Sequence, residues 1–335
     1  MKDKLLNLLK VAISLGLIVY LFLSFPDVNW RTVLADFRLG PWLLGVAVYF
    51  LAIGFNVLKW RHLLATLDVS VPYANLYRHN LVGLFFANLP LSMVGADIAR
   101  GWDLARQSEG GGTRVAVSVL VDRLIGLSGY LLGAGLGLAF AVVGLGRSDL
   151  TWLLASLGAL LLVFALGFAV LMSQRLRRLI ERVFAVRPLA RFLPLYQKLS
   201  DSVQVYRTHG GALVVALGIG MATVVTTCVV NALAASAAGT RVPLEWVFIL
   251  TPLTAFAPFL PSIASGLGWN QGVFIVLYVE LAKLGGDDPT GFAASVLVMS
   301  LAMQAIILLA SLPGAFLWWR KRQASYPKAG PPGGR

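Results

Sequence analysis

The sequence has little charge and almost no cysteine. Only 13% of the 335 residues are charged and 58% are hydrophobic, with a mean hydropathy of +0.79. Water-soluble domains average about 25% charged residues, so the composition excludes an ordinary soluble enzyme and favours an all-α polytopic membrane protein. Cys228 is the single cysteine and lies in an apolar run, where we interpret it as small hydrophobic packing. One cysteine excludes disulfides and predicts neither a zinc nor an iron–sulfur site.

Motifs of catalysis and cofactor binding are also lacking. The chain has no HExxH helix, no Walker loop, no GxGxxG opening a soluble βαβ unit and no nucleophile–base pair. We therefore expect neither enzyme activity nor a cofactor. The net charge of +13 comes mainly from basic residues in short loops between apolar stretches. We interpret it as the positive-inside bias of a membrane protein, and we expect no nucleic-acid partner.

Six apolar stretches are candidates for full membrane spans, each of which needs about 20 helical residues. Lys2 and Lys4 before the first stretch resemble the start of a signal peptide, but no small-residue cleavage site follows. We therefore expect the first stretch to be a retained span. The predicted spans are 5–25, 41–58, 115–145, 150–172, 211–238 and 290–319.

Two further apolar stretches, 73–103 and 244–281, are interrupted in the middle by proline and glycine. Proline removes a backbone donor, and interrupted backbone at membrane depth is tolerated only inside protein or beside a water-filled cavity. Each stretch is therefore predicted to be a re-entrant helical hairpin rather than a single span. The breaks are Pro90 and Gly95 in the first stretch and Pro261, Gly266 and Gly268 in the second.

Basic residues indicate the orientation of the chain. The loop 174–209 holds eight lysines and arginines against two acidic residues, and the segment 321–335 is basic and rich in proline and glycine. Both should be cytoplasmic, which places both termini on the inner side of a bacterial inner membrane and makes 321–335 a disordered tail. Apolar residues interleaved in the loop 174–209 suit either a helix on an anionic leaflet or a plain loop.

The two interrupted stretches superimpose without a gap when the chain is shifted along itself so that Val71-Pro72 falls on Val242-Pro243. The same shift lays the spans 41–58 and 115–145 on 212–229 and 286–316. Chance recurrence of Leu-Pro breaks in apolar sequence is the alternative. We interpret the pattern as an inverted-topology repeat with halves 1–147 and 148–320, because such repeats build a transport site near the membrane midplane.

Among the charged residues inside the apolar stretches, Asp97, Arg100, Asp122 and Arg123 are the candidates for a charged site. Asp122 and Arg123 follow Arg114 by about 12–14 Å of helix, which is close to the middle of the ~30 Å hydrocarbon core. An unpaired charge there costs several kcal/mol. Asp97 and Arg100, in the first hairpin, either pair with each other or reach Arg123 and Asp122. Two compatible interpretations stay open: Arg100 and Arg123 bind an anionic group that the aspartates orient, or the four charges lock the hairpin against the span.

Side-chain amides lie at the predicted hairpin tips. Asn88 stands at the tip of the first hairpin, and Asn270 and Gln271 follow the glycines of the second. Asn56 lies one turn inside the end of the second span. All four are candidates to bind a polar headgroup, although the tip amides would equally serve to satisfy the interrupted backbone.

Four other polar residues are interpreted as structural. Lys59 and Trp60 are expected to form an anchor at the membrane surface, with the lysine in water and the indole among headgroups. Asn231 and Gln304 are isolated polar residues in spans, and we interpret them as hydrogen-bonding residues between helices.

An ordered set of motifs resembles a known family. In chain order they are Asn56-x3-Trp60-Arg61-x-Leu63-Leu64, Asn88-Leu89-Pro90 through Gly95-x-Asp97-x2-Arg100, Ser118-x3-Asp122-Arg123-x2-Gly126, and Leu260-Pro261-Ser262-Ile263 through Gly266-x-Gly268. Together they resemble the transmembrane flippase-like domain of lysyl-phosphatidylglycerol synthases, which also occurs as stand-alone membrane proteins. The resemblance extends from about residue 5 to residue 320.

The resemblance implies an eight-segment bundle with two re-entrant elements that moves lipids, or helps to move them, between leaflets. It implies a membrane lipid as the partner: an anionic phospholipid, a hopanoid or a lipid-linked sugar. The aminoacyl-transferase domain of the full synthases has no counterpart in the sequence, so we do not expect aminoacyl-lipid synthesis by this chain alone. The family usually reads Gly-x-Arg-Glu-Gly after the second hairpin, whereas this chain reads Gly268-Trp269-Asn270-Gln271-Gly272, so that amides replace both charges.

The sequence therefore favours a lipid translocator that works without ATP, downhill or coupled to an ion gradient. One alternative is a non-transporting membrane partner that binds lipid and recruits a lipid-modifying enzyme through the loop 174–209. Another is an intramembrane transferase acting on a lipid-linked sugar. The transferase would need a carboxylate with a free face, for which Asp97 and Asp122 are the candidates. A transporter of small soluble solutes is the last alternative.

Overall fold

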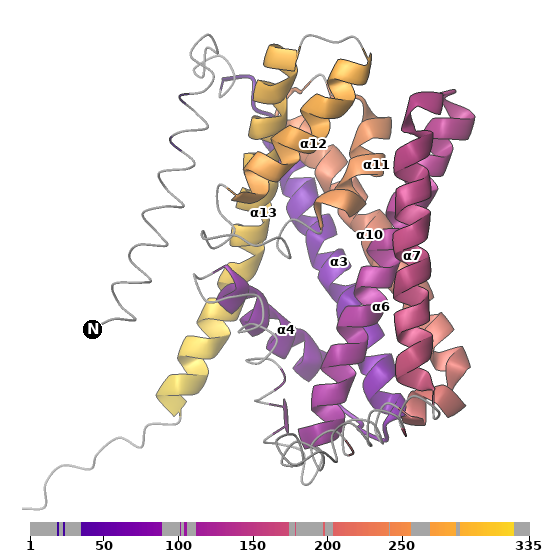
Figure 1. Ribbon diagram of the computed structural model, residues 1–335. Helices are drawn as coiled ribbons and strands as arrows, with labels where there is room; N and C mark the ends of the chain where they lie inside the picture. The colour runs from indigo at the N-terminus through magenta and orange to yellow at the C-terminus, as the bar shows by residue number, and fades with distance from the viewer. Residues whose placement is uncertain are drawn as a thin grey trace, which may run out of the picture.

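The structure is a bundle of α-helices (Figure 1). The computed structural model describes residues 19, 23, 35–88, 101, 104–105, 112–173, 178, 197, 204–240, 242–255, 269–285 and 289–324, and no strand occurs among them. The predicted all-α polytopic membrane architecture is confirmed. The main helices are α3 (Leu39–Thr66), α4 (Tyr73–Ala87), α6 (Gly112–Ala139), α7 (Thr151–Met172), α10 (Gly210–Ala237), α11 (Leu244–Thr254), α12 (Trp269–Gly285) and α13 (Pro289–Ala324).

Five of the described helices are long and apolar enough to cross a bilayer: α3, α6, α7, α10 and α13. Between α6 and α7 the chain forms a π-helical turn, η1 (Phe140–Gly144), and a 3-10 turn, η2 (Ser148–Leu150). Together with these turns, the five long helices correspond to the predicted spans 41–58, 115–145, 150–172, 211–238 and 290–319. The chain is therefore an integral membrane protein. Most of the predicted span 5–25 and most of the loop 174–209 lie outside the described residues.

The helices α3 and α10 pack side by side and run antiparallel. At the start of α3 the Arg38 N–H donates to the Ala237 carbonyl at the end of α10, at 2.8 Å. At the other end the His62 Nε2 lies 3.2 Å from the Ala212 carbonyl oxygen. Contacts at both ends show that the two 28-residue helices are aligned along their whole length. We call the end of the bundle where α3 finishes the Thr66 end, and the opposite one the Leu39 end.

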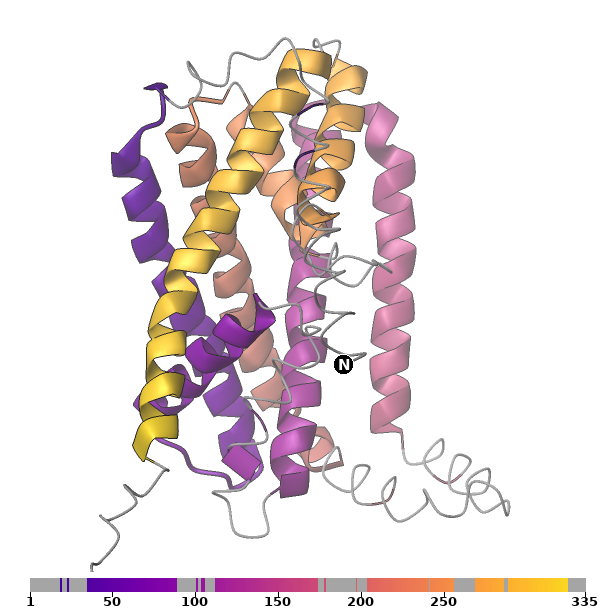
Figure 2. The same ribbon diagram turned by 90° about the vertical axis from the view of Figure 1, so that its left-hand side faces the viewer.

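The shorter helices lie in opposite halves of the bundle. In the half with the Thr66 end, α4 packs against α3 and α13, whereas α11 and α12 contact each other in the half with the Leu39 end (Figures 1 and 2). The helix α11 packs against α10 and α6, and α12 packs against α13. Both α4 and α11 begin after a proline of nearly identical backbone conformation, with φ −56° and ψ 137° at Pro72 and φ −58° and ψ 138° at Pro243.

The short helices end close to the predicted breaks. In the first stretch α4 ends at Ala87 and Asn88 caps it, immediately before Leu89-Pro90. In the second stretch α11 ends at Thr254 and α12 begins at Trp269. The shape of the two hairpins stays a prediction, because the residues at the breaks lie outside the described part of the chain: Pro90, Gly95, Pro261, Gly266 and Gly268.

A close backbone contact holds α4 on α13. A Cβ atom on Gly314 would overlap the Leu81 carbonyl of α4, so this position of α13 needs glycine. Phe86 of α4 adds an edge-on contact with Trp318 of α13, with ring centroids 5.6 Å apart. The contact fixes the position of α4, whose Asn80 lines the cavity described below.

The helix α7 stands at the edge of the bundle and packs on α6 (Figures 1 and 2). At the Leu39 end, Arg147 pairs with Asp149 at 2.9 Å and lies over the Trp246 ring of α11, 5.2 Å from its centroid. This partly exposed pair ties the turn between α6 and α7 to α11.

Candidate functional site: a polar cavity inside the bundle

A cavity of about 410 Å³ lies inside the bundle, lined by α3, α4, α6, α10, α11, α12 and α13. Pockets that bind small ligands have volumes of about 300–1,000 Å³, so the cavity falls in the size range of a ligand site. The part of α10 that lines it runs from Gly220 to Asn231. At 1.5 Å per residue this stretch starts about 15 Å from one end of α10 and stops about 9 Å from the other. The cavity therefore lies at the middle depth of the spans.

The lining side chains repeat with the period of a helix. On α10 they include Thr223, Thr227 and Asn231, and on α3 they include Asn56 and Lys59. Residues three and four apart share one face of a helix, so a single stripe of each helix faces the cavity.

Many polar side chains line the cavity. Charged side chains, amides and hydroxyls are unusual at membrane depth, where they mark water-filled cavities and substrate pathways. The charged residues are Lys59, Asp122 and Arg123; the amides are Asn56, Asn80, Asn231, Asn270, Gln271 and Gln304; the hydroxyls are Tyr49, Tyr130, Thr223, Thr227, Thr251, Thr254 and Ser300.

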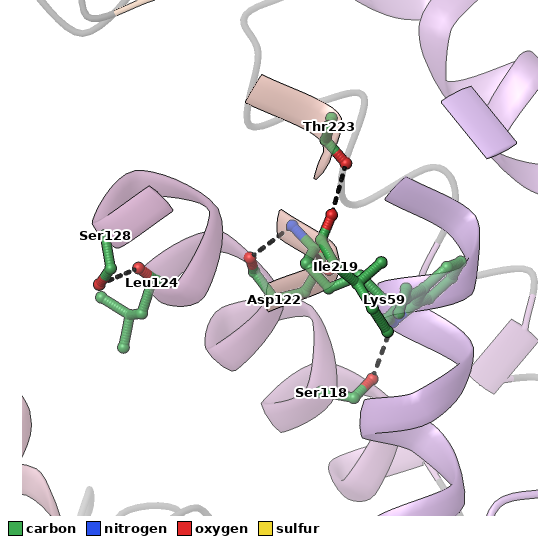
Figure 3. Close-up of polar contacts among 8 residues, drawn as sticks. Lys59, Ser118, Asp122, Leu124, Ser128, Ile219 and Thr223 are labelled. Carbon is green, nitrogen blue, oxygen red and sulfur yellow. Dashed lines mark hydrogen bonds and ion pairs between the residues drawn. The ribbon is translucent and has the colours of Figure 1, made fainter. Parts of the chain in front are cut away.

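A buried ion pair joins α3 to α6 beside the cavity (Figure 3). The Lys59 Nζ lies 3.2 Å from Asp122 Oδ1 and donates to the Asp122 backbone carbonyl, also at 3.2 Å. The two side chains are only 5% and 3% exposed. Lys59 stands about 10 Å before the end of α3 and Asp122 about 15 Å after the start of α6, so the pair lies within the membrane-spanning part of both helices.

Two glycines leave room for the Lys59 side chain. A Cβ atom on Gly126 of α6 would stand 3.1 Å from the Lys59 Nζ, and one on Gly220 of α10 would stand 3.7 Å from the Lys59 Cδ. Beside the lysine, the Trp60 Nε1 donates to the Ser118 Oγ of α6 at 3.1 Å. The lysine and the tryptophan together fix the packing of α3 on α6 at the edge of the cavity.

The prediction of a surface anchor at Lys59 and Trp60 is therefore wrong. The two residues are 4% and 0% exposed, because both side chains point at α6 rather than at the membrane surface. One signal in the sequence favoured the observed position. Asn56, already a site candidate, is three residues before Lys59, and residues at that spacing share a helix face.

Five of the predicted site residues line this one cavity: Asn56, Asp122, Arg123, Asn270 and Gln271. They come from α3, α6 and α12, which lie far apart in the sequence. Both Asp122 and Arg123 line the cavity, and Asp122 also meets Lys59. Asp97 and Arg100 lie outside the described residues, so the arrangement of four charges stays a prediction.

Asn88 does not line the cavity; it caps α4. Its side-chain amide donates to the Leu84 carbonyl at 3.1 Å, and its backbone N–H approaches the carbonyls of Leu84 and Phe85. The tip amides were predicted either to bind a headgroup or to satisfy interrupted backbone. The described contacts of Asn88 match the second role, because they pair with carbonyls at the end of a helix.

Two polar residues that sequence reasoning assigned to helix–helix contacts lie on the cavity wall, namely Asn231 and Gln304. Asn231 is 2% exposed, and its Nδ2 donates at 3.4 Å to Thr227 in its own helix. Among the described residues its Oδ1 has no hydrogen-bond partner, and the same is true of the Oδ1 of Asn270. Buried acceptors of this kind require a donor from water or a ligand.

The formal charge of the cavity wall is positive. Lys59 and Arg123 supply two cations, and Asp122 is the only carboxylate among the described lining residues. Within the described residues no group of three or more potential metal ligands occurs. The arrangement therefore suits an uncharged or anionic polar group rather than a metal ion.

Cys228 is 3% exposed, which confirms its interpretation as a packing residue.

Comparison with known proteins identifies one family. The sequence pattern of the family described as "Lysylphosphatidylglycerol synthase TM region" matches residues 7–311, which include every residue of the cavity wall. Comparison with curated proteins and with solved structures gave no match.

Proposed function

The chain belongs to the lysylphosphatidylglycerol synthase TM family, and on that premise we propose that it translocates a membrane lipid between leaflets. The family links the chain to membrane lipids. The proposal adds that the polar cavity receives the headgroup while the acyl chains stay in the bilayer. Movement is downhill or coupled to an ion gradient, since the sequence has no Walker loop.

The observation that carries the proposal is the polar cavity at the middle depth of the spans. A headgroup crossing the hydrocarbon core without a polar path loses its hydrogen bonds to water, and each lost bond costs free energy. The cavity replaces water with amides, hydroxyls and the Arg123 guanidinium. A guanidinium has five N–H donors, so Arg123 can keep a protein partner and still bind an anionic headgroup.

The arrangement of the helices supports an inverted repeat. The shift that lays Val71 on Val242 also carries the bounds of α3 onto the bounds of α10, and the start of α4 onto the start of α11. The contacts between helices follow the same equivalence. In the first half α4 packs against α3 and α13, and in the second half α11 packs against their counterparts α10 and α6. Opposed halves of this kind suit alternating access to one central site.

Positions related by the repeat also lie together in the cavity wall. The shift lays Asn56 on Thr227 and Asn80 on Thr251, and all four line the cavity. A site at the interface of two repeats is where transporters with inverted topology bind their substrates. This equivalence favours transport over a passive role as a binding partner.

The pairing of Asp122 weighs against the transferase alternative. A general acid, base or nucleophile needs access to the substrate, whereas Asp122 is 2% exposed and engaged by Lys59. We therefore propose that the chain is a transporter and not an enzyme.

We also propose that the Thr66 end faces the cytoplasm of a bacterial inner membrane. Basic residues gather there at the helix ends, among them Arg61, Arg114 and Arg207, whereas Arg147 at the Leu39 end is balanced by Asp149. Reporter proteins fused after Ala324 test the orientation: green fluorescent protein should fluoresce there, and alkaline phosphatase should be inactive. The opposite result would reverse the assignment.

The test of translocation uses proteoliposomes that contain a phosphatidylglycerol analogue with a fluorescent acyl chain. Dithionite, added outside, bleaches only lipid in the outer leaflet, so the rate of further bleaching measures how fast inner-leaflet lipid moves to the outer leaflet. We expect wild type to speed bleaching of the inner pool and Arg123→Gln to abolish the effect while the protein stays folded. Arg61→Gln removes an exposed cation from α3 and should leave the rate unchanged.

Two results would contradict the proposal. Equal rates for Arg123→Gln and wild type would remove Arg123 from the pathway. Wild type that binds lipid but never accelerates its movement would favour the alternative of a membrane partner, for which replacement of the arginines in the loop 174–209 should disrupt a complex.

A further inference from the structure

The charges of the cavity wall are segregated along the chain. The charged residues that the structure places on the wall are Lys59, Asp122 and Arg123; they precede residue 148 and come from α3 and α6. Every described lining residue after residue 148 is uncharged, on α10, α11, α12 and α13. The two predicted halves of the repeat therefore present one cationic wall and one neutral, hydrogen-bonding wall to the same space.

The neutral wall has acceptors in need of donors. The Oδ1 atoms of Asn231 and Asn270 lack a hydrogen-bond partner in the part of the chain that the structure describes, and Asn231 is more than nine-tenths buried. Gln271 beside Asn270 is 2% exposed. Uncharged acceptors suit hydroxyl donors, since neither the amide nor the hydroxyl carries a charge that must be neutralised at this depth.

An ammonium group is disfavoured by the same wall. The single described carboxylate, Asp122, is held by Lys59 through both its side chain and its carbonyl. A second ammonium entering the cavity would meet two cations and no other described carboxylate. Like charges at close range in a medium of low dielectric repel strongly.

We propose that the cavity takes a lipid headgroup made of one phosphate and one uncharged hydroxylated group, a polyol or sugar phosphate, and discriminates against headgroups that carry an ammonium group. The phosphate lies beside Arg123, and the hydroxyls donate to Asn231 and Asn270. This inference rests on the proposed function and names the substrate class for the same cavity.

The test measures binding of short-chain lipids to the purified protein in mild detergent by isothermal titration calorimetry. The probes are phosphatidylinositol and phosphatidylglycerol, which carry phosphate and hydroxyls, phosphatidic acid, which carries phosphate alone, and lysyl-phosphatidylglycerol, which adds ammonium groups. We expect phosphatidylinositol and phosphatidylglycerol to bind at least about tenfold more tightly than phosphatidic acid or lysyl-phosphatidylglycerol. Phosphatidic acid lacks one or two hydrogen bonds to the wall, and lysyl-phosphatidylglycerol brings a positive charge that the wall repels.

Variants separate the two parts of the wall. Asn231→Leu should remove the preference of phosphatidylinositol over phosphatidic acid, because leucine fills a similar space without an acceptor. Gln271→Glu should raise affinity for lysyl-phosphatidylglycerol about tenfold, because it adds a carboxylate to the neutral wall. Asn75→Leu, at an exposed position of α4, is the matched control and should change neither ratio.

The results distinguish this inference from the proposed function. Equal affinity of wild type for phosphatidylglycerol and lysyl-phosphatidylglycerol, or for phosphatidylinositol and phosphatidic acid, would overturn the inference and leave translocation standing. Selective binding without accelerated movement in proteoliposomes would overturn translocation and leave the selectivity of the cavity standing.

Discussion

Removal of Lys59 should destabilise the protein far more than removal of a typical surface lysine. In Lys59→Met the aliphatic stem is retained, but the ammonium that contacts both the carboxylate and the carbonyl of Asp122 is lost. The Asp122 side chain is 3% exposed, so water does not replace the lost partner. The variant therefore leaves a charge buried at membrane depth.

The magnitude follows from this burial. Breaking a buried ion pair by removing one partner costs about 3–5 kcal/mol, whereas replacing both partners by neutral groups of similar volume is often close to neutral. We expect about 3–5 kcal/mol for Lys59→Met, and a smaller loss for the double variant Lys59→Met/Asp122→Asn than for Lys59→Met alone. The second substitution thus rescues the first, and the two effects are not additive.

The assay is reversible unfolding in mixed micelles with increasing sodium dodecyl sulfate, followed by tryptophan fluorescence. Arg147→Met provides the comparison, because the Arg147–Asp149 pair is partly exposed and should contribute far less. Additive losses in the double variant, or equal losses for Lys59→Met and Arg147→Met, would refute the argument that the buried pair holds α3 on α6.

Two further predictions concern glycines that permit close contact. Gly126→Leu should displace the Lys59 ammonium, whose Nζ would lie 3.1 Å from a Cβ at this position, and it should lower the free energy of unfolding in the same assay. Gly314→Ala should cost about 1–3 kcal/mol, because the new Cβ overlaps the Leu81 carbonyl and separates α4 from α13. Gly218, which has no atom within 4 Å of a Cβ built there, is the control position for both changes. Losses at Gly218 as large as those at the other two sites would contradict the contact argument.

The membrane spans could be predicted closely from the sequence. Each of the five described spans overlaps its predicted range, and α4 ends at Ala87 with Asn88 as its cap, just before the predicted Leu89-Pro90 break. Such features depend on local properties, namely the length of an apolar run and the loss of a backbone donor at proline.

The partner of Asp122 could not be predicted in the same way. The contact with Lys59 joins positions 63 residues apart, and it depends on how α3 and α6 pack rather than on either helix alone. The lysine stands near the end of an apolar run, where snorkelling to the membrane surface is the usual outcome. Gly126 and Gly220 make the inward path available, and only the assembled bundle brings both beside one lysine.

Asn231 illustrates a second limit. A single amide in an apolar run is consistent with a helix–helix hydrogen bond or with a cavity wall, and the two differ in what lies opposite. The relation between the repeats offered a clue, because the shift that aligns them places the candidate Asn56 on Thr227, one turn before Asn231. A search for polar residues at repeat-related positions would have pointed to this face of α10.

The most direct test of the central claim fills the cavity while keeping its charges. Thr227→Trp places a large side chain on the cavity wall, whereas Val225→Trp places the same side chain on the same helix at a position that is 54% exposed. In the proteoliposome assay we expect the first variant to stop lipid translocation and the second to match wild type. Equal rates for the two variants, both folded, would contradict the claim that the headgroup crosses the membrane through this cavity.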